Sequence, residues 1–520
     1  MYSFKAPVDD IMFSLRHVAQ VDGLPGWEIS DAEDVLGHFA EFAENVLAPL
    51  NAIGDREGAQ YSDGQVQMPT GFVDAYKQLS DDGWQGLTAP VEFGGQDVSP
   101  LIVAGVSEIF TGANHSLQMV CALAPGAIAT LRLFGSSQQQ TEWIPKLASG
   151  EFLSTMCLTE AAAGSDLSVI STRAVLTETG WSLSGEKIYI SGGGQDLTDG
   201  ILHLVLARSG DADAGLSGLS LFLCPSQPGV RVTRIEDKMG LHASPTCQML
   251  FDDAAAELIG EEGAGLKAMF KMMNEVRIDV ALQGVAHASA AAYVAQLYAA
   301  ERKQGRTIEG NAAKLCDHAD VRRMLDEQRI LAIGTRGICH IAIKEIQLAQ
   351  KPALVEFLTS LCKVMGSEAG IRSADLGIQI LGGCGYLTEY GMSQIWRDAR
   401  ITAIYEGANG IHKRGLVTRG LRKGGAMDDF AVLVQALGEG DQSVNDDVEH
   451  WLKVAKQLSE SDDRTPQSHA FTELCANVLR KAVWVRIATM AHHHSDAEEL
   501  LRLSATVLNE ERIYKVSQHD

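Results

Sequence analysis

The spacing of apolar residues changes twice along this chain, and this change constrains its fold more than any other feature of the sequence. Up to about residue 150, apolar residues recur at three- and four-residue steps, which predicts amphipathic helices. From about residue 151 to 260, short β-rich runs bounded by turn-forming residues predict strands. After residue 265 the helical spacing returns over long stretches. Helices, then strands, then helices is not the alternating order of a Rossmann sheet, so the pattern disfavours that fold.

The expected elements follow from these runs. Helices are predicted from Asp31 onward and within residues 71–84, 266–303, 320–350 and 352–383, with a loop over 51–63. Five or more antiparallel strands are predicted from the runs at 172–191, 201–210, 219–225 and 230–235. A joint at 420–429 precedes about three more helices, with a polar hinge at 459–468. The predicted domains are therefore 1–150, 151–262, 263–425 and 426–520, an α+β organisation in which the third domain is a helical bundle.

Composition excludes several classes of protein. The 520 residues include 43 basic and 67 acidic side chains, and the formal charge of −24 argues against a protein that neutralises a nucleic-acid backbone. The nine cysteines are odd in number and show no C-x-x-C pair, which indicates a reducing, cytoplasmic setting and no zinc site. The first residues carry acids before any apolar run, and no apolar run approaches roughly 18 residues, so we expect neither a signal peptide nor a membrane span.

Two glycine clusters could lie close to a nucleotide, although each has an ordinary structural alternative. Leu381–Tyr386, with the sequence LGGCGY, follows a helical pattern rather than a strand, so a turn that caps the helix is the better interpretation of this motif alone. Ser191–Gly194, with the sequence SGGG, ends a strand pattern and taken alone indicates a β-turn or a bulge.

Two polar segments could carry chemistry. Glu406, in IYEGANG, stands between apolar and small residues; a carboxylate in such surroundings tends to have a raised pKa and can act as a general base, whereas a solvated loop glutamate is the simpler alternative. The segment Cys157–Asp166, CLTEAAAGSD, offers hydroxyls beside small residues, which suits a flat polar ring or any junction of strand and loop. Cys157 itself is expected to be a buried, inert thiol.

Basic and imidazole groups near the C-terminus are less informative. His492, His493 and His494 are adjacent in sequence and cannot all face one metal from a helix, so a solvated helix end is expected. A basic cluster could meet phosphates or could complement a helix dipole, and the sequence leaves both open. Its members are Lys413, Arg414, Arg419, Arg422 and Lys423.

Together the motifs resemble the acyl-CoA dehydrogenase family, in order and over roughly residues 30 to 420. The resemblance rests on EWIPKLASGEF, CLTEAAAGSD, LSGEKIYISGG, KMGLHASPTCQMLFDD, ERKQGR, QILGGCGYLTEYGMSQIWRDARI and IYEGANGI. The opening YSFKAPVDDIMFSLRHV, the segment HADVRRML and the additional C-terminal helices are similar to the large branch that includes methylthiopropionyl-CoA and long-chain acyl-CoA dehydrogenases. The family fold implies an N-terminal helical domain, a central antiparallel β-barrel and a C-terminal four-helix bundle, with FAD between barrel and bundle.

The resemblance also implies roles for individual residues. Glu406 matches the catalytic base, and Gly407, Asn274, Arg277 and Ser165 match the substrate side, although the family often has Asp at the position of Asn274. Metal ligands are not implied. The positions that match contacts to FAD are Cys157, Leu158, Thr159, Ser165, Tyr189, Ile190, Ser191, Arg302, Gln304, Gln379, Gly382, Gly383, Ala408 and Gly410. Ser191 stands where the family commonly has Thr, and its hydroxyl can make the same hydrogen bond. Arg302 and Gln304 are expected to reach the FAD of another subunit, which implies a homodimer or homotetramer.

The implied reaction is α,β-dehydrogenation of an acyl-CoA thioester to the 2-enoyl-CoA. Candidate substrates are 3-methylthiopropionyl-CoA and fatty acyl-CoA. The expected electron acceptor is an electron-transfer flavoprotein, with an acyl-CoA oxidase as an alternative. A flavin-containing, nucleic-acid-associated relative of the alkylation-response type would need a basic C-terminal surface, whereas residues 428–463 are rich in acids. A desulfinase is disfavoured because Glu406 is present. Since CoA is polyanionic and the chain is acidic, CoA binding is expected to rely on local cations such as Arg277, Arg302 or the basic cluster.

Overall fold

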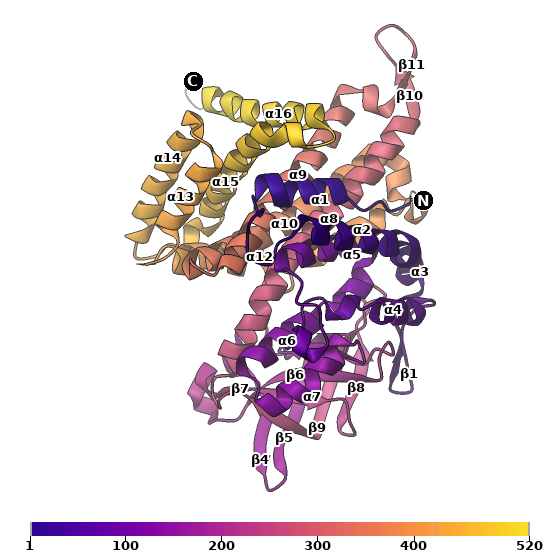
Figure 1. The fold of residues 1–520 in the computed structure, drawn as a ribbon, viewed down its shortest axis with the longest axis vertical. Coiled ribbons are helices and arrows are strands. Elements are labelled where there is room, and N and C mark those ends of the chain that lie inside the picture. The colour runs from indigo at the N-terminus through magenta and orange to yellow at the C-terminus, as the bar shows by residue number, and fades with distance from the viewer. Residues whose placement is uncertain (1–2, 423, 518–520) are drawn as a thin grey trace. The chain divides into compact units, whose positions relative to one another are not determined.

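The structure is a computed structural model that describes residues 3–422 and 424–517, without the side chains of residues 212, 271, 272, 274, 275 and 510–517. Its chain divides into two compact units (Figure 1). Unit 1 contains Met1–Glu44, Pro100–Gly112 and Arg277–Asp520, and unit 2 contains Asn45–Ser99 and Ala113–Val276. Helices α5 and α8 contribute to both units, and each unit is described by itself.

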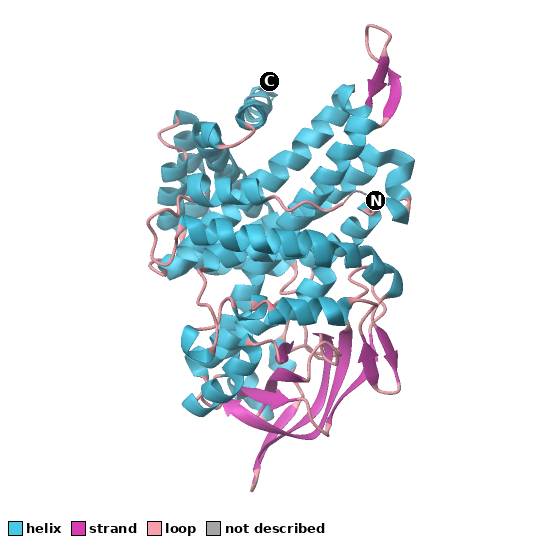
Figure 2. Ribbon diagram, turned by 45° about the vertical axis from the view of Figure 1, so that its right-hand side comes forward, coloured by secondary structure: helices cyan, strands magenta, loops and turns pink. Residues whose placement is uncertain are grey.

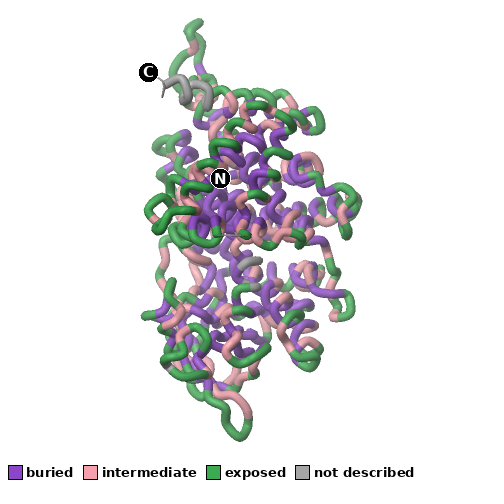
Figure 3. Tube along the Cα trace, turned by 90° about the vertical axis from the view of Figure 1, so that its left-hand side faces the viewer, coloured by how far each residue is buried: buried purple, intermediate pink, exposed green. Residues whose placement is uncertain are grey.

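Unit 1 is helical apart from one hairpin. Its long helices are α8 (Gly265–Glu301, from Arg277 onward), α9 (Ala319–Leu348) and α10 (Pro352–Leu381). The other elements are α1 (Val8–Phe13), α2 (Ile29–Phe42), the first part of α5 (Pro100–Cys121), β10 (Lys303–Arg306), β11 (Ala312–Lys314), α11 (Met392–Arg400), α12 (Asn409–Gly415), α13 (Met427–Leu437), α14 (Gln442–Ser459), α15 (Ser468–Met490) and α16 (Ala497–Ser517). Figure 3 shows the buried residues along the inner faces of these helices.

Unit 2 combines short helices with a sheet. Its helices are α3 (Ala48–Glu57), α4 (Phe72–Asp81), the rest of α5, α6 (Leu123–Phe134), α7 (Ser137–Ala148) and the start of α8. Its strands are β1 (Gln60–Ser62), β2 (Gln65–Gln67), β3 (Phe152–Cys157), β4 (Arg173–Thr177), β5 (Gly180–Ser191), β6 (Gly200–Arg208), β7 (Leu219–Pro225), β8 (Val230–Ile235) and β9 (Thr246–Ile259). Figure 2 shows strands β3 to β9 gathered in one sheet region of this unit.

The predicted antiparallel β-barrel needs correction. The structure has a seven-stranded sheet in the order β3-β6-β4-β5-β9-β7, with β8 on β9 and a further pairing between β6 and β7. Strand β3 pairs with β6 in parallel from Phe152↔Gly200 to Cys157↔Val205, and β4 also meets β6 in parallel. Parallel neighbours need a long crossover connection, and the segment that carries β4 and β5 provides it between β3 and β6. We therefore describe a mixed sheet rather than an antiparallel barrel.

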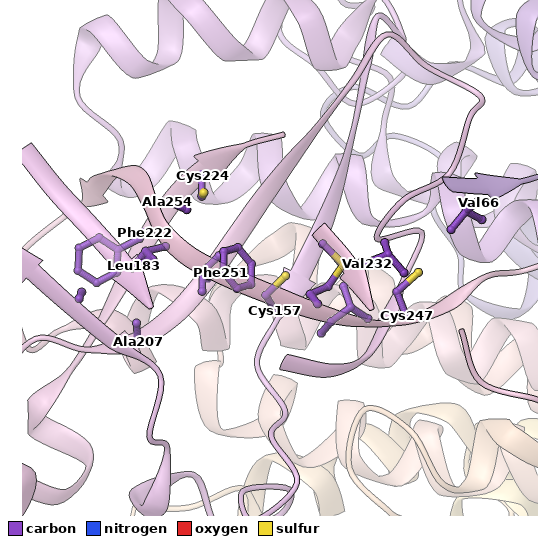
Figure 4. Close-up of a cluster of buried hydrophobic side chains, with 14 residues drawn as sticks. Val66, Cys157, Leu183, Ala207, Phe222, Cys224, Val232, Cys247, Phe251 and Ala254 are labelled. Carbon is purple, nitrogen blue, oxygen red and sulfur yellow. The ribbon is translucent and has the colours of Figure 1, made fainter. Parts of the chain in front are cut away.

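Alternation along the strands builds the sheet's core. Apolar side chains on one face form a cluster that includes Cys157, Leu183, Phe222 and Phe251, all at most 1% exposed (Figure 4). Strand β6 is buried along its whole length, which matches the largely apolar run ILHLVLAR, in which only His203 and Arg208 are polar. A cysteine in this setting behaves as a small apolar residue. Cys157 is buried as expected, and burial raises the pKa of its thiol to about 12, which disfavours the reactive thiolate.

Several boundaries differ from the prediction. The loop expected over 51–63 is wrong in its first half because α3 runs on to Glu57 and stops where Gly58 adopts φ 65°. The C-terminal region has four helices rather than three, and the predicted hinge separates α14 from α15. At the start of α14, Asp441 caps the helix by accepting hydrogen bonds from the backbone N–H groups of Ser443 and Val444.

In residues 3–422 and 424–517, no single helix is long and apolar enough to cross a bilayer. The bent pair α5 and α6 meets that test when taken together, by length and composition alone.

Buried ion pairs join α1, α5 and α9 within unit 1. Arg336 of α9 is fully buried and donates to both carboxylate oxygens of Glu108 on α5 at 2.6–3.1 Å. It also donates to Asp10 of α1 at 3.4 Å. Two turns earlier on α9, Arg329 bonds both Asp10 and Glu499 of α16. These contacts tie the N-terminal segment and the last helix to the bundle.

Replacing Arg336 tests this connection. The variant Arg336→Met leaves the Glu108 carboxylate buried without its partner, which typically costs about 3–5 kcal/mol of stability. Arg323→Met, which removes an exposed partner of Asp320 and Glu327, is expected to cost no more than about 1 kcal/mol. Urea unfolding followed by circular dichroism distinguishes the two. Equal midpoints would contradict the assigned role of Arg336.

Candidate active site

Glu406 lies in a tight turn of unit 1, between a short 3₁₀ helix at Ile401–Ala403 and α12. Glu406 has φ 54° and Gly407 has φ 91°, so two consecutive residues adopt the left-handed region. A side chain other than glycine is rarely held there without support from its surroundings. A Cβ on residue 407 would lie 3.0 Å from Nε2 of His412, which accounts for glycine at that position.

The carboxylate of Glu406 is buried although the residue as a whole is half-buried. Within the part of the chain that the structure describes, its Oε2 atom has no hydrogen-bond partner. Burial raises the pKa of Glu406 to about 7, and the nearby cations Arg277 and Lys363 limit the rise. A carboxylate with this pKa and an unused oxygen is suited to accept a proton near neutral pH.

Three side chains bind the backbone of the turn. Nε of Arg277, on α8, donates to the carbonyl oxygen of Glu406 at 3.4 Å, and Nε2 of His412 lies 3.1 Å from the same oxygen. Burial, with the Arg277 and Lys363 cations, lowers the pKa of His412 to about 3, so His412 is neutral and donates this hydrogen bond. Nζ of Lys363, on α10, donates to the carbonyl oxygen of Gly407 at 2.7 Å.

A chain of polar side chains that begins at Tyr405, the residue before Glu406, was not predicted from the sequence. The hydroxyl of Tyr405 donates to Oε1 of Gln283, whose Nε2 donates to Oδ2 of Asp279 at 3.1 Å. Ser107 of α5 donates to the other oxygen of Asp279. Asp279 and Gln283 are four residues apart on α8, so they share one face of the helix. Polar residues at that spacing inside the apolar stretch 276–286 are the signal that could have indicated this network.

In unit 2, a buried ion pair shapes the segment after Cys157. Nζ of Lys187 is fully buried and donates to Oε1 of Glu160 at 2.8 Å and to the carbonyl oxygen of Leu158 at 3.0 Å. Burial alone would raise the pKa of Glu160, but Lys187 and hydrogen bonds from Ser171 and Thr172 lower it to about 2. The N–H of Ile188 donates to the carbonyl oxygen of Thr159 at 2.9 Å. The two segments predicted to hold a flavin are therefore joined to each other.

The same segments present polar groups at the surface of unit 2. Thr159 and Ser191 are half-buried and Ser165 is exposed, and their hydroxyls have no partner among the described residues. Tyr189 has φ 60° and a side chain that is 61% exposed, whereas Ile190, Cys157 and Leu158 are buried. Unpaired hydroxyls on a rigid backbone fit the edge of a flat polar ring such as a flavin.

The predicted nucleotide-side residues lie at the hairpin end of unit 1. Arg302 and Gln304 are exposed around β10, and Gln379, Gly382 and Gly383 are exposed at the end of α10. Hydrogen bonds with Tyr298 and Tyr390 lower the pKa of Cys384, and the charge of Arg302 lowers it further. Arg302 and Cys384 are therefore neighbours. The LGGCGY motif forms a 3₁₀ helix over Gly382–Tyr386 that follows α10. Ala408 and Gly410 are exposed on either side of the start of α12.

Other predicted residues have different surroundings. The side chain of Asn274 lies outside the described residues. In the basic cluster, Lys413 pairs with Glu368 at 2.9 Å and Arg419 with Glu356 at 2.6 Å, and Lys423 lies outside the described residues. The expected solvated histidine end is wrong for His494, which is buried and bonds Asp10 at 3.0 Å because η13 (Ala491–His493) turns it toward α1. Among the described residues no group of three or more His, Cys, Asp or Glu side chains could hold a metal ion.

Comparison with known proteins identifies the family. Three family models match the chain in order: the acyl-CoA dehydrogenase N-terminal domain over residues 30–151, the middle domain over 155–254 and the C-terminal domain over 263–421. The chain belongs to the acyl-CoA dehydrogenase family. This membership makes it an oxidoreductase and implies a flavin cofactor, which the polar edge of unit 2 fits.

Curated relatives of this acyl-CoA dehydrogenase family member align with most of its length. 3-Methylmercaptopropionyl-CoA dehydrogenase of Ruegeria pomeroyi is 39% identical over 88% of this chain and 83% of its own length. FadE5 of Mycobacterium tuberculosis, a broad-specificity linear acyl-CoA dehydrogenase, is 31% identical over 81% of this chain and 75% of its own length. A butyryl-CoA dehydrogenase of Syntrophomonas wolfei is 31% identical over 73% of this chain and 68% of its own length.

Solved structures give the same fold. Butyryl-CoA dehydrogenase of Megasphaera elsdenii is 26% identical, with a TM-score of 0.66 over 74% of this chain and 97% of its own. ACDH-11 of Caenorhabditis elegans, solved with C11-CoA, has a TM-score of 0.81 over 97% of this chain and 91% of its own at 19% identity. The second comparison shows that the fold, including the C-terminal helices, occurs in another protein.

Replacing Lys187 tests the predicted flavin segment. Lys187→Met leaves Glu160 buried without its cation and frees the Leu158 carbonyl, so we expect the purified protein to lose most of its bound flavin. Absorbance of the flavin band relative to the protein band measures the loss. Arg231→Met, which breaks the exposed pair with Asp252 in the same sheet, is the control and should keep its flavin. Full flavin content in a folded Lys187→Met variant would contradict the role given to this ion pair.

Proposed function

We propose that this protein is an FAD-dependent acyl-CoA dehydrogenase that converts an acyl-CoA thioester to the 2-enoyl-CoA. One observation carries the proposal: the buried Glu406 carboxylate with a pKa raised to about 7, an oxygen without a partner and two cations beside it. Family membership supplies the reaction class, and this carboxylate is the group in unit 1 that is suited to remove a proton from carbon.

In the proposed reaction Glu406 takes the α-proton of the thioester. The turn orients the Glu406 carboxylate. The residues that bind the carbonyl oxygens of Glu406 and Gly407 hold the turn in that orientation. The N–H of Gly407 is proposed to donate to the thioester carbonyl, where negative charge grows as the proton leaves. Removing one such donor typically costs a factor of about 100 to 1,000 in rate. Arg277 is proposed to lie on the substrate side, as the sequence implies.

FAD, when bound, supplies the acceptor for the β-hydride. Thr159, Ser165 and Ser191, with the backbone around Cys157, Leu158, Tyr189 and Ile190, are proposed to hold the ring. Arg302, Gln304, Gln379, Gly382, Gly383, Ala408 and Gly410 are proposed to hold the rest of the nucleotide. Of these, Arg302 and Gln304 are proposed to reach the cofactor of a second subunit, so the active form is a homo-oligomer.

For the substrate, we propose a short, sulfur-containing acyl-CoA of the 3-methylmercaptopropionyl type, in preference to a long-chain fatty acyl-CoA. The relative of that name covers most of both chains and is 39% identical. The electron acceptor is proposed to be an electron-transfer flavoprotein; a chain solved in a study of the electron transferring flavoprotein of Acidaminococcus fermentans matches at 26% identity and a TM-score of 0.67. A cytoplasmic location fits the nine cysteines, all of which are free thiols.

Glu406→Gln tests the assignment of the base. The variant should keep its yellow colour and still bind acyl-CoA, because glutamine has nearly the same shape, but substrate added without oxygen should no longer bleach the flavin. Glu345→Gln, a half-buried carboxylate on α9, should bleach as the unmodified protein does. Bleaching at an unchanged rate in Glu406→Gln would refute the assignment.

The pH dependence follows from the pKa of Glu406. The base must be ionised, so kcat/KM should rise about tenfold per pH unit below about pH 7 and level off above it. A group at the ordinary glutamate pKa would give a flat profile between pH 5.5 and 8. Steady-state rates with a dye acceptor over this range provide the measurement.

A substrate panel tests the proposed specificity. Anaerobic titration with 3-methylthiopropionyl-CoA, butyryl-CoA and palmitoyl-CoA, followed at the flavin band, should show complete bleaching with the first and little with the last. A preference for palmitoyl-CoA would contradict the proposed substrate while leaving the reaction class intact. Turnover with oxygen as fast as with electron-transfer flavoprotein would instead identify an oxidase.

A further inference from the structure

Lys363 is a fully buried cation whose charge has no role in the proposed reaction as described so far. It lies in the middle of α10, in the run LCKVMGSEAG, among residues that are nearly all buried. A lone ammonium in such surroundings is costly unless several acceptors meet it. One acceptor of its hydrogen bonds lies in the Glu406 turn and the other at the start of α12.

Lys363 binds the turn through hydrogen bonds from the side of α10. Nζ donates to the carbonyl oxygen of Gly407 at 2.7 Å and to Oδ1 of Asn409 at 3.0 Å. Asn409 is in turn hydrogen-bonded to Ser367, one helical turn after Lys363, at 3.1 Å. Lys363 and Ser367 therefore lie on one face of α10 and hold both the residue after the base and the first residue of α12.

The charge of Lys363 also acts on Glu406. No ion pair joins these two described residues, so the carboxylate keeps its unused oxygen while it feels the cation through a medium of low polarity. Burial lowers the pKa of Lys363 to about 8, and Glu406 opposes this decrease. The opposite charges of Glu406 and Lys363 therefore each favour the ionised form of the other.

We propose that Lys363 is a positioning residue for the base: its ammonium fastens the Glu406–Gly407 turn to α10 and stabilises the ionised carboxylate from a distance. The inference rests on the proposed role of Glu406. Other charged or titratable groups that face Glu406 are Arg277 from α8, His412 from α12 and Tyr405 from the turn itself; Glu356 and Arg419 act on Arg277, and Glu368 acts on Lys363.

A lysine that only held the backbone in place would not change the pKa of Glu406, whereas the proposed role of Lys363 predicts such a change. If Lys363 is made neutral, the ionised base loses a stabilising cation, so its pKa rises. The pH at which kcat/KM reaches half its plateau should therefore move upward by roughly 0.5 to 1 unit. The plateau rate should also fall, by about tenfold, because the turn is less firmly held. KM should change less than kcat, since Lys363 lies behind the base.

The experiment compares three variants by their pH profiles and flavin content. Lys363→Met removes the charge and both hydrogen bonds. Lys363→Gln removes the charge and keeps a donor, and it serves if the first variant does not fold. Asn409→Ala removes part of the fastening and keeps the charge. We expect an upward shift of the midpoint in both Lys363 variants, and in Asn409→Ala a lower plateau with the midpoint unchanged.

A matched control lies on the neighbouring helix. Lys344 of α9 is half-buried and donates to two backbone carbonyls, those of Ala19 and Gln20, at 2.9 and 3.1 Å. Lys344→Met should leave both the midpoint and the plateau unchanged. Suppose that Glu406→Gln is inactive. If the pH midpoint of kcat/KM is then unchanged in both flavin-loaded variants, Lys363→Met and Lys363→Gln, the proposal is overturned. Bleaching by Glu406→Gln would instead show that the assignment of the base has failed.

Discussion

Burial of ionised side chains between helices and strands is the constraint on which this structure depends. Among the residues that the structure describes, Arg336, Lys363 and Lys187 are cations with 0% exposure, and each is met by oxygens from a segment distant in sequence. Because an unmatched buried charge is costly, each pairing fixes where two segments meet. Arg336 fixes α5 and α1 on α9, Lys363 fixes the base turn on α10, and Lys187 fixes the loop after β3 on β5.

The three cations differ in how completely they are matched. Arg336 and Lys187 each contact a carboxylate directly, at 2.6 and 2.8 Å, so both partners are satisfied. Lys363 is bound by a carbonyl and an amide oxygen instead, and the nearby carboxylate of Glu406 is left with an unused oxygen. A fully paired carboxylate is a poor base because its lowered pKa weakens it, as in Glu160. Proximity without pairing leaves Glu406 with a pKa near neutrality and an unpartnered oxygen, as the proposed role of a base requires.

Much of the architecture could be predicted from the sequence, because periodicity is a local property. The long helices α8, α9 and α10 and the strands β4 to β8 occur where the spacing places them. Pairing between strands is not local, which is why the parallel pairing of β3 with β6 and the seven-stranded mixed sheet were missed. The end of α3 was also missed, since Asn51 and Gly54 are weak helix formers; at position 54 a Cβ would lie 2.6 Å from the Phe72 ring, so the packing requires glycine there.

For the candidate site, the sequence by itself indicated Glu406 as the proposed base, with its small neighbours and the hydroxyl-bearing segment, because these lie within short continuous motifs. Only the tertiary structure decided the pKa of Glu406, the partners of Lys363 and the polar chain from Tyr405 to Ser107. Each of these depends on contacts between residues 44 to 172 positions apart. Desolvation and electrostatic pairing depend on which segments pack together, and the local sequence does not show which distant segments will meet.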